Sequence, residues 1–323
     1  HALECEADAI CDGEEAYIPA VMEHIELAGI HSGDSACVLP SVNISEEHLA
    51  TIRDYTKRIA EAMHVRGLMN MQYAIENDVV YVLEANPRAS RTVPLVSKIC
   101  NIQMVPIATE VITMPLTGRP SPIPELKEKS YEYYGVKEAV LPFNMFPEVD
   151  PVLGPEMRST GEVLGLAKTF GEAFFKAQEA TQTVLPKGGK VLITVSNKDK
   201  DELPELAHAL KDAGFDIYAT EGSAELIEAE GIAVERVKKL HEGRPNLVDL
   251  ITNGEMDLVI NTPAATGESA EDDSYIRKTA IKAHTPYFTT MAAALASAKG
   301  IKTVETSEES GIASLQEIHA KIS

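Results

Sequence analysis

Three oxygen-bearing side chains are expected to lie together on a β-hairpin formed by residues 66–85. Both halves of this stretch have the pattern of strands, and Asn77-Asp78 between them forms a tight turn. Gln72 belongs to the first strand, Glu84 ends the second, and Asn86 follows two positions later, where its side chain can point to the same side as that of Glu84. Such oxygens suit Mg²⁺ or Mn²⁺, whose remaining coordination positions are left to phosphates and water.

Two arginines come directly after this hairpin. The guanidinium groups of Arg88 and Arg91 have the shape that binds phosphate or carboxylate oxygens. Metal ligands next to such cations indicate phosphoryl transfer. Taken alone, a glutamate at a strand end is an ordinary solvent-exposed residue and Asn86-Pro87 is an ordinary turn, so the prediction depends on the combination.

A second group of anion-binding residues is expected in the C-terminal part of the chain. Beyond Gly189, short apolar strands alternate with amphipathic helical stretches, which predicts a parallel sheet with ligands outside the carboxyl ends of its strands. At those ends lie Lys200, Thr220, Gly222, Ser223, Lys239, Asn261 and Thr262. Hydroxyls, a permissive glycine, free backbone N–H groups and two lysines together suit the phosphate of a mononucleotide, although each of them taken singly is an ordinary turn or surface residue.

The elements before the hairpin are a strand and a helix. Residues 2–10 alternate apolar residues with acids, which predicts a half-buried strand whose acidic face is most often solvated. Asp12-Gly13 turns this strand into another near residues 17–23. Ser45 caps a predicted helix that runs up to the hairpin and serves packing.

The elements after the hairpin form a helix, a connector and a second helix. The segment after Pro94 is expected to be helical to Glu110 and to end before Met114-Pro115, after which several prolines mark a connector. Strands are expected around residues 136–142. Thr169-x-x-Glu172 is a capping box that opens a helix running to Ala180.

Composition indicates a soluble globular protein of about two domains. The chain has 323 residues with 44% apolar and 24% charged residues, and its formal net charge of −21 argues against binding nucleic acid or an anionic membrane through a general basic field. No apolar run reaches the length of a membrane span. The four cysteines lack a C-x-x-C pair, which favours buried free thiols in a reducing cytosol. Sequence alone leaves the oligomeric state open, including a homo-oligomer.

Several motifs are recognisable as those of a known family. The segment Glu84-Ala-Asn86-Pro-Arg88 with Arg91-Thr-Val-Pro94 resembles the metal-binding strand pair of the ATP-grasp enzymes. Residues 24–40, 66–72 and 140–163 closely resemble the large subunit of carbamoyl phosphate synthetases, and the resemblance covers the whole chain. The chain is most similar to the C-terminal end of that subunit.

The resemblance implies an α/β fold in three segments. Residues 1–118 would form the C-terminal lobe of an ATP-grasp domain, residues 119–186 a connector that completes the synthetic domain, and residues 187–323 a three-layer, methylglyoxal-synthase-like allosteric domain with a parallel sheet. The chain begins at His1 directly in a strand-like pattern, so it is expected to be a fragment.

The family's reaction is the phosphorylation of carbamate by Mg-ATP, which supplies pyrimidine and arginine synthesis. By resemblance, Gln72 and Glu84 contact the nucleotide and, with Asn86, the metal, while Arg88 and Arg91 act on phosphate oxygens or carbamate. The other expected nucleotide contacts are Glu4 at the ribose and the loop residues Gly29, Ile30, His31 and Ser32. In the full enzyme, a glutamine amidotransferase small subunit is the expected partner.

The resemblance also implies two effector sites. The C-terminal residues given above would bind uridine monophosphate or inosine monophosphate, although Ser223 stands where threonine is common and Pro263 where a hydroxyl residue is often found. The expected ornithine ligands are Glu26, Asp34, Glu138, Tyr287 and Thr289. The alternative is that these acids form a merely structural cluster.

Two other functions compete with catalysis by this chain. An ATP-grasp site lies between two lobes, and the sequence contains only the later one, so the isolated chain is expected to be inactive alone. The alternative function is that of a regulatory module that binds effectors without catalysis. A weaker alternative is methylglyoxal synthase activity in the last domain.

Overall fold

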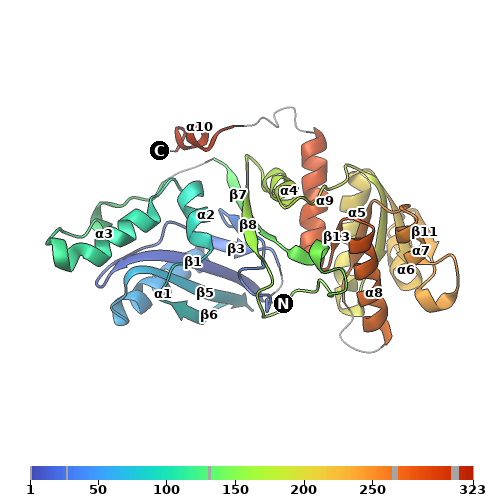
Figure 1. Cartoon of the computed structure of the whole chain (residues 1–323), viewed down its shortest axis with the longest axis horizontal. Helices are drawn as coiled ribbons and strands as arrows, with labels where there is room; N and C mark the ends of the chain where they lie inside the picture. Colours follow the sequence, from blue (N-terminus) through green and yellow to red (C-terminus); the bar gives the residue numbers. More distant parts are fainter. Residues whose placement is uncertain (1, 27, 130–131, 264–267, 307–312, 323) are drawn as a thin grey trace. The chain divides into compact units, whose positions relative to one another are not determined.

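The computed structural model describes residues 2–26, 28–129, 132–263, 268–306 and 313–322 (Figure 1). The chain divides into two compact units. The first comprises His1–Lys137, Leu166–Phe170 and Gly311–Ser323, and the second comprises Glu138–Gly165 and Gly171–Ser310. The domain boundaries at residues 118 and 186 stay predictions.

The first unit is built on a mainly antiparallel sheet with the strand order β6-β5-β1-β3-β4-β7-β8, and β2 pairs with β1. Its strands are β1 (Leu3–Asp12), β2 (Ala16–Tyr17), β3 (Val21–His24), β4 (Cys37–Leu39), β5 (Arg66–Glu76), β6 (Val79–Asn86), β7 (Tyr134–Val140) and β8 (Gly161–Ala167). Residues of β7 and β8 belong to both units. The helices of this unit are α1 (Glu46–Ala62), α2 (Thr92–Ile99), α3 (Met104–Thr117), the short η1 (Ile123–Glu125) and α10 (Leu315–His319).

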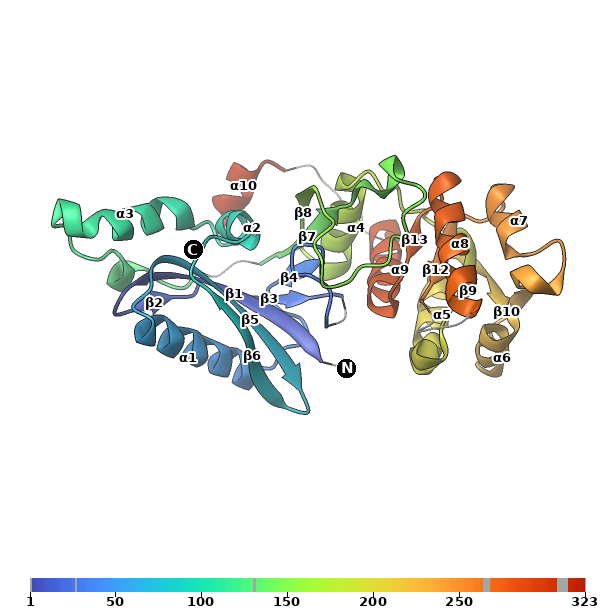
Figure 2. The ribbon, with the colours of Figure 1, turned by 60° about the horizontal axis from the view of Figure 1, so that its bottom comes forward.

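The predicted hairpin is confirmed, because β5 and β6 pair antiparallel around Asn77 and Asp78, both of which have positive φ. The predicted helix cap is also confirmed, since the Ser45 hydroxyl accepts a hydrogen bond from the backbone N–H of His48 at the start of α1. Helix α1 covers one face of β1, β5 and β6 (Figure 2). The core on that face contains alternate residues of β1 and β5, with Ile52 of α1 among them.

Three sequence-based expectations need correction. The acidic face of β1 is not solvated, since Glu6 is 2% and Asp8 0% exposed. Helix α3 does not stop before Pro115 but continues to Thr117, because a proline within the last turn costs only one backbone hydrogen bond, and Gly118 with φ 67° ends it. Strand β8 was not expected, because its glycines and mixed residues give a weak alternation.

The second unit has a sheet of five strands in the order β11-β10-β9-β12-β13. All of its strand pairs are parallel, which confirms the predicted parallel sheet. Its strands are β9 (Gly189–Thr194), β10 (Phe215–Thr220), β11 (Val234–Val237), β12 (Leu258–Asn261) and β13 (Tyr287–Phe288). Its helices are α4 (Phe170–Ala180), α5 (Leu203–Asp212), α6 (Glu221–Ala229), α7 (Leu247–Thr252), α8 (Glu268–Lys282) and α9 (Met291–Thr306), with the short η2 (Pro142–Met145), η3 (Asn197–Glu202) and η4 (Leu240–Glu242).

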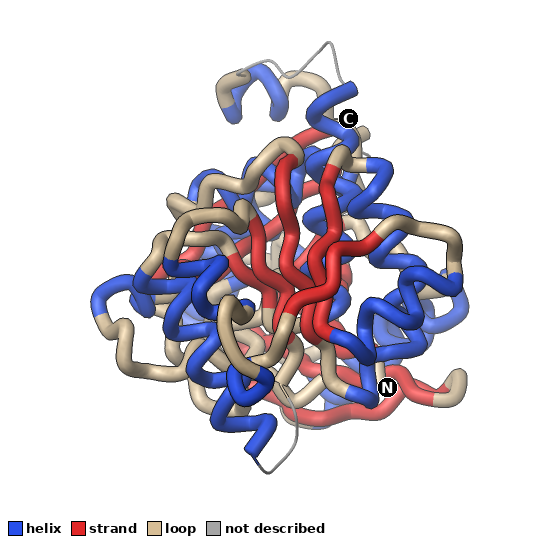
Figure 3. Tube along the Cα trace, turned by 90° about the vertical axis from the view of Figure 1, so that its right-hand side faces the viewer, coloured by secondary structure: helices blue, strands red, loops and turns tan. Residues whose placement is uncertain are grey.

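Helices lie on both sides of this parallel sheet (Figure 3). Val191 and Ile193 of β9 pack with residues of α5, α6 and α9, whereas Leu192 packs with residues of α7 and α8. Alternate residues of one strand thus enter two separate cores, which explains why the strand is apolar throughout. The carboxyl ends of the strands are left for a ligand.

Among the described residues, no single helix has the length and apolar composition to cross a membrane. The bent pair α2 and α3, which meet at 110°, passes that test only when the two helices are combined.

Candidate functional site

The face of the first sheet opposite α1 carries two rows of polar residues. The strand register sets Glu84 of β6 opposite Gln72 of β5, and Gln72 opposite Glu6 of β1. In the second row, Asn86 lies opposite Asn70, and Asn70 lies opposite Asp8. Directly opposed residues have Cβ atoms about 5 Å apart, so each row brings three polar side chains together.

The structure brings together the three predicted metal ligands on this face. Glu84 is exposed, and Gln72 is half-buried with its amide N–H donating to the Ser32 hydroxyl at 3.1 Å. The Asn86 amide nitrogen is buried without a hydrogen-bond partner among the described residues. Of the two predicted arginines, Arg88 is exposed and its guanidinium donates to the carbonyl of Ala89, while Arg91 is the N-cap residue of α2.

The predicted nucleotide loop lies against Glu4. The Glu4 carboxylate accepts a hydrogen bond from the backbone N–H of Gly29 at 3.1 Å. Ile30 and His31 continue the loop to Ser32, whose carbonyl accepts from the buried Lys137 ammonium at 3.0 Å. Lys137 was missed from sequence, although it fixes this loop from the β7 side of the sheet.

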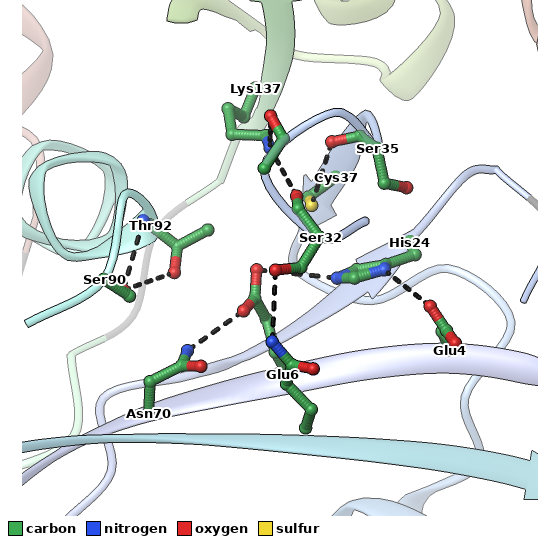
Figure 4. A network of polar contacts seen from close by, with 12 residues as sticks. Glu4, Glu6, His24, Ser32, Ser35, Cys37, Asn70, Ser90, Thr92 and Lys137 are labelled. Carbon is green, nitrogen blue, oxygen red and sulfur yellow. Dashed lines mark hydrogen bonds and ion pairs between the residues drawn. The ribbon is translucent and has the colours of Figure 1, made fainter. Parts of the chain in front are cut away.

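Sequence reasoning also missed the network around the acids of β1 (Figure 4). The Asn70 amide donates to both Glu6 and Asp8, at 2.9 and 3.0 Å. Asp8 also accepts from the hydroxyls of Ser90 at 2.7 Å and Thr92 at 2.6 Å. The pattern of acids at alternate positions of one strand, followed by an amide pair at positions 70 and 72, could have indicated this network.

Burial and charge shift the pKa values of the two acids in opposite directions. Burial and then the charge of Glu6 raise the pKa of Asp8 to about 6, against the opposing effect of its hydrogen-bond donors. Burial also raises the pKa of Glu6, but the neighbouring His24 and the Asn70 amide outweigh it, so that this pKa lies below its usual range. At neutral pH both acids are therefore ionised on this face.

His24 of β3 lies between two carboxylates. Its Nδ1 is 3.5 Å from Glu4 and its Nε2 is 3.5 Å from Glu6, both of which are ion-pair contacts (Figure 4). Burial lowers the pKa of His24, but Cys37 and the two carboxylates raise it, so that it lies well above its usual value. The imidazolium balances part of the negative charge of the face.

In the second unit, the predicted phosphate ligands gather at the start of α6. Thr220 ends β10 and caps α6, yet its side chain makes no capping hydrogen bond, and Ser223 lies buried in the first turn. The Lys200 ammonium lies so near that a Cβ on Gly222 would be 3.1 Å from it. A helix N-terminus, two hydroxyls and one ammonium together are groups that can bind a phosphate.

A neighbouring cavity of about 170 Å³ includes Lys239, which is exposed. Its other lining residues include Thr194, Ser196, His241 and Asp273. The cavity lies at the carboxyl end of β9, where the fold predicts a ligand.

Asn261 and Thr262 serve the framework of this site. Asn261 is 0% exposed, accepts from Arg277 at 2.7 Å and donates to Asp273 at 2.9 Å. The Thr262 hydroxyl accepts from the backbone N–H of Ser196 at 2.9 Å. Asn261 thus positions Asp273 at the cavity wall.

The five predicted ornithine ligands are divided between the two units. Glu26 and Asp34 belong to the first unit, whereas Glu138, Tyr287 and Thr289 belong to the second. Glu138 accepts a hydrogen bond from Gln178 at 2.6 Å. The grouping of all five stays a prediction.

Comparison with known proteins relates both units to one family. Residues 2–114 match the model of the carbamoyl-phosphate synthase L chain, ATP binding domain, and residues 202–289 match that of the MGS-like domain. A carbamoyl phosphate synthase large chain of Methanosarcina barkeri is 46% identical over 99% of this chain and 80% of its own length.

Two further relatives carry the name carbamoyl phosphate synthase large chain, C-terminal section. That of Aquifex aeolicus is 44% identical over 99% of this chain and 62% of its own length, and that of Methanocaldococcus jannaschii is 45% identical over 99% of this chain and 53% of its own length. The chain spans only 30% of another large chain from Methanosarcina barkeri, with 45% identity.

Proposed function

Because the chain belongs to the carbamoyl phosphate synthase large-chain family, with an ATP-binding domain of the ATP-grasp type followed by an MGS-like domain, we propose that its first unit phosphorylates carbamate with ATP. The observation that carries this proposal is the strand register that aligns Glu84, Gln72 and Glu6 across three strands. This register supplies a row of oxygen ligands beside the loop whose Gly29 N–H donates a hydrogen bond to Glu4.

The donor set suits a hard cation. Gln72, Glu84 and Asn86 offer one carboxylate and two amide oxygens. The Asn86 amide nitrogen is buried without a hydrogen-bond partner within the described part of the chain, so this amide is free to present its oxygen to a cation. Mg²⁺ or Mn²⁺ held by these residues would neutralise the negative charge of the phosphate oxygens.

The protein's own residues mainly position and neutralise the reactants. In this proposal Glu4 accepts hydrogen bonds from the ribose hydroxyls, and the loop from Gly29 to Ser32 lies along the nucleotide. Arg88 and Arg91 donate to phosphate or carbamate oxygens, which favours the transition state because charge accumulates there. Lys137 keeps the loop in place through its hydrogen bond to Ser32.

The second unit would regulate this reaction by binding effectors. We propose that uridine monophosphate or inosine monophosphate places its phosphate between Lys200 and the start of α6, with its nucleoside toward the cavity at Lys239. The proposal also includes ornithine as a second effector, a glutamine amidotransferase small subunit as partner and a reducing cytosolic location. The four buried free cysteines suit such a compartment.

A second candidate function is that of an effector-binding module without catalysis. It is favoured by the arrangement of Lys200 beside the start of α6 and by the neighbouring cavity at Lys239 in the second unit. The two candidates differ in whether the first unit alone turns over substrate.

The reverse reaction separates the two candidates. The chain is incubated with carbamoyl phosphate and Mg-ADP, and ATP formation is measured beside uridine monophosphate binding by calorimetry. ATP formation that disappears in Glu84→Gln supports catalysis. Effector binding without ATP formation supports the regulatory module, and the absence of both contradicts the two candidates together.

A further inference from the structure

Three different metal-binding side chains meet beneath the nucleotide loop. Glu6, His24 and Cys37 come from the neighbouring strands β1, β3 and β4, and their donor atoms all lie within 4.8 Å of one another. All three side chains are buried. Figure 4 shows them converging beside Ser32.

The polar atoms of this cluster lack the hydrogen bonds that buried groups normally make. Both ring nitrogens of His24 and one carboxylate oxygen of Glu6 have no hydrogen-bond partner among the described residues, although His24 is 3% and Glu6 2% exposed. Their 3.5 Å contacts are ion pairs without hydrogen-bond geometry. Orphaned polar atoms at such depth are rare in native proteins and point to a missing ligand.

The surroundings of His24 match those of a metal-bound histidine. Its Nε2 is the nitrogen that faces Glu6, and its Nδ1 faces the carboxylate of Glu4. A carboxylate on the far nitrogen of a metal-bound imidazole orients the ring and raises its basicity. The Cys37 thiol donates a weak, 3.6 Å hydrogen bond to the carbonyl of Ser35, which a metal can replace.

The local charge also favours a cation. The buried Lys137 ammonium is the nearby positive charge on the β7 side, and it donates to the carbonyls of Ser32 and Gly33. The negative charges on this face are the carboxylates of Glu4, Glu6 and Asp8 on β1. These three carboxylates outnumber the Lys137 ammonium and the His24 imidazolium together, so a divalent ion reduces an excess of negative charge.

We propose that Glu6, His24 and Cys37 form a second metal site, selective for a thiophilic divalent cation such as Zn²⁺ or Co²⁺. Imidazole, thiolate and carboxylate together suit zinc in tetrahedral coordination, with water as the fourth ligand. Binding releases the thiol proton and any imidazolium proton to the solvent. The site is distinct from the oxygen ligands Gln72, Glu84 and Asn86, and the inference does not depend on the proposed function.

The test is a titration of the metal-free, reduced chain with Co²⁺. We expect one Co²⁺ per chain, with the near-ultraviolet absorption of a cobalt–thiolate bond, displaced by equimolar Zn²⁺ and retained in a large excess of Mg²⁺. Cys37→Ser should abolish the absorption, and His24→Gln should weaken binding at least tenfold. Cys11→Ser is the matched control, because Cys11 is equally buried but belongs to the core on the opposite face of the sheet.

Two results would overturn the proposal. One is the absence of stoichiometric Co²⁺ binding to the native chain, and the other is an absorption that persists unchanged in Cys37→Ser. If circular dichroism shows that Cys37→Ser is unfolded, Glu6→Gln decides instead. The Glu6→Gln variant should keep the cobalt–thiolate absorption but bind Co²⁺ at least tenfold more weakly. An unchanged affinity for Co²⁺ would exclude Glu6 as a ligand.

Discussion

Arg277 binds Asp150 through two parallel hydrogen bonds, from Nε at 2.8 Å and from Nη2 at 2.7 Å. Its third nitrogen donates to Asn261 at 2.7 Å, and the side chain is almost completely buried. One guanidinium on α8 thereby joins the segment between η2 and β8 to the end of β12. Burial raises the pKa of Asp150, but the hydrogen bonds from Arg277 and Ser274 outweigh it and lower this pKa below its usual range.

This relationship predicts that Arg277→Met destabilises the second unit strongly. Removal of the cation leaves the Asp150 carboxylate, which is 33% exposed, and the buried Asn261 amide without their partner, and a buried group that loses its hydrogen bond in this way costs about 1–3 kcal/mol. Urea unfolding monitored by circular dichroism measures the loss. Arg277→Lys should recover only part of it, since an ammonium cannot make the two parallel bonds.

The matched control is Arg236→Met. Arg236 pairs with Glu221 and Glu228 on the surface, where its side chain is 43% exposed. Such exposed pairs contribute about 1 kcal/mol or less. Equal losses in the Arg236 and Arg277 variants would show that the buried network has no special role.

For the first unit, we expect Glu84→Gln to weaken Mn-ADP binding at least tenfold, which is about 1.4 kcal/mol. The substitution removes the single carboxylate among three metal ligands while preserving its size. Isothermal titration calorimetry measures the affinity, and Glu76→Gln at the other end of the hairpin is the control because Glu76 is exposed at the end of β5. Equal affinities for the native chain and Glu84→Gln would exclude Glu84 as a ligand.

In the second unit, Lys200→Met should weaken uridine monophosphate binding about 10- to 100-fold, because a hydrogen bond between charged groups contributes about 1.5–3 kcal/mol. The acidic chain repels the nucleotide at long range, so the local ammonium has to supply the attraction. Lys239→Ala should weaken binding as well. Lys211→Met is the control, since Lys211 lies on the surface of α5 beside Asp216. Unchanged affinity in both test variants would refute the site.

Sequence periodicity identified the elements whose partners are close in the chain. The hairpin of β5 and β6 was predictable because its turn and both strands lie within residues 66–86, and the parallel sheet was predictable because strands and helices alternate regularly. The alternation of β1 also predicted a strand correctly. It could not reveal that Glu6 and Asp8 are buried, because that depends on what covers the strand.

The missed residues depend on contacts between distant parts of the chain. Asn70 binds Glu6 across 64 positions, Thr92 binds Asp8 across 84, and Arg277 binds Asp150 across 127. No local pattern encodes such pairs. His24 was overlooked for the same reason, since its two carboxylate neighbours become visible only once β3 is aligned with β1.

The last prediction concerns pH and Asp8. Its pKa in the folded chain is raised from 3.8 to about 6, so the protonated carboxyl stabilises the fold at low pH and this contribution is lost as the pH rises through about 6. Asp8→Asn removes the titrating group at nearly constant size. The difference in unfolding free energy between native chain and variant should therefore change by about 2 kcal/mol between pH 4 and pH 7, with the native chain relatively more stable at pH 4.

Urea titrations at several pH values measure this difference, and Asp54→Asn on the exposed side of α1 provides the control. The control should show no comparable change, because its carboxylate is largely solvated. A difference for Asp8→Asn that is constant from pH 4 to pH 7 would mean that the three hydrogen-bond donors to Asp8 already hold it ionised throughout. A difference of the opposite sign would mean that the donors Asn70, Ser90 and Thr92 outweigh burial and the charge of Glu6.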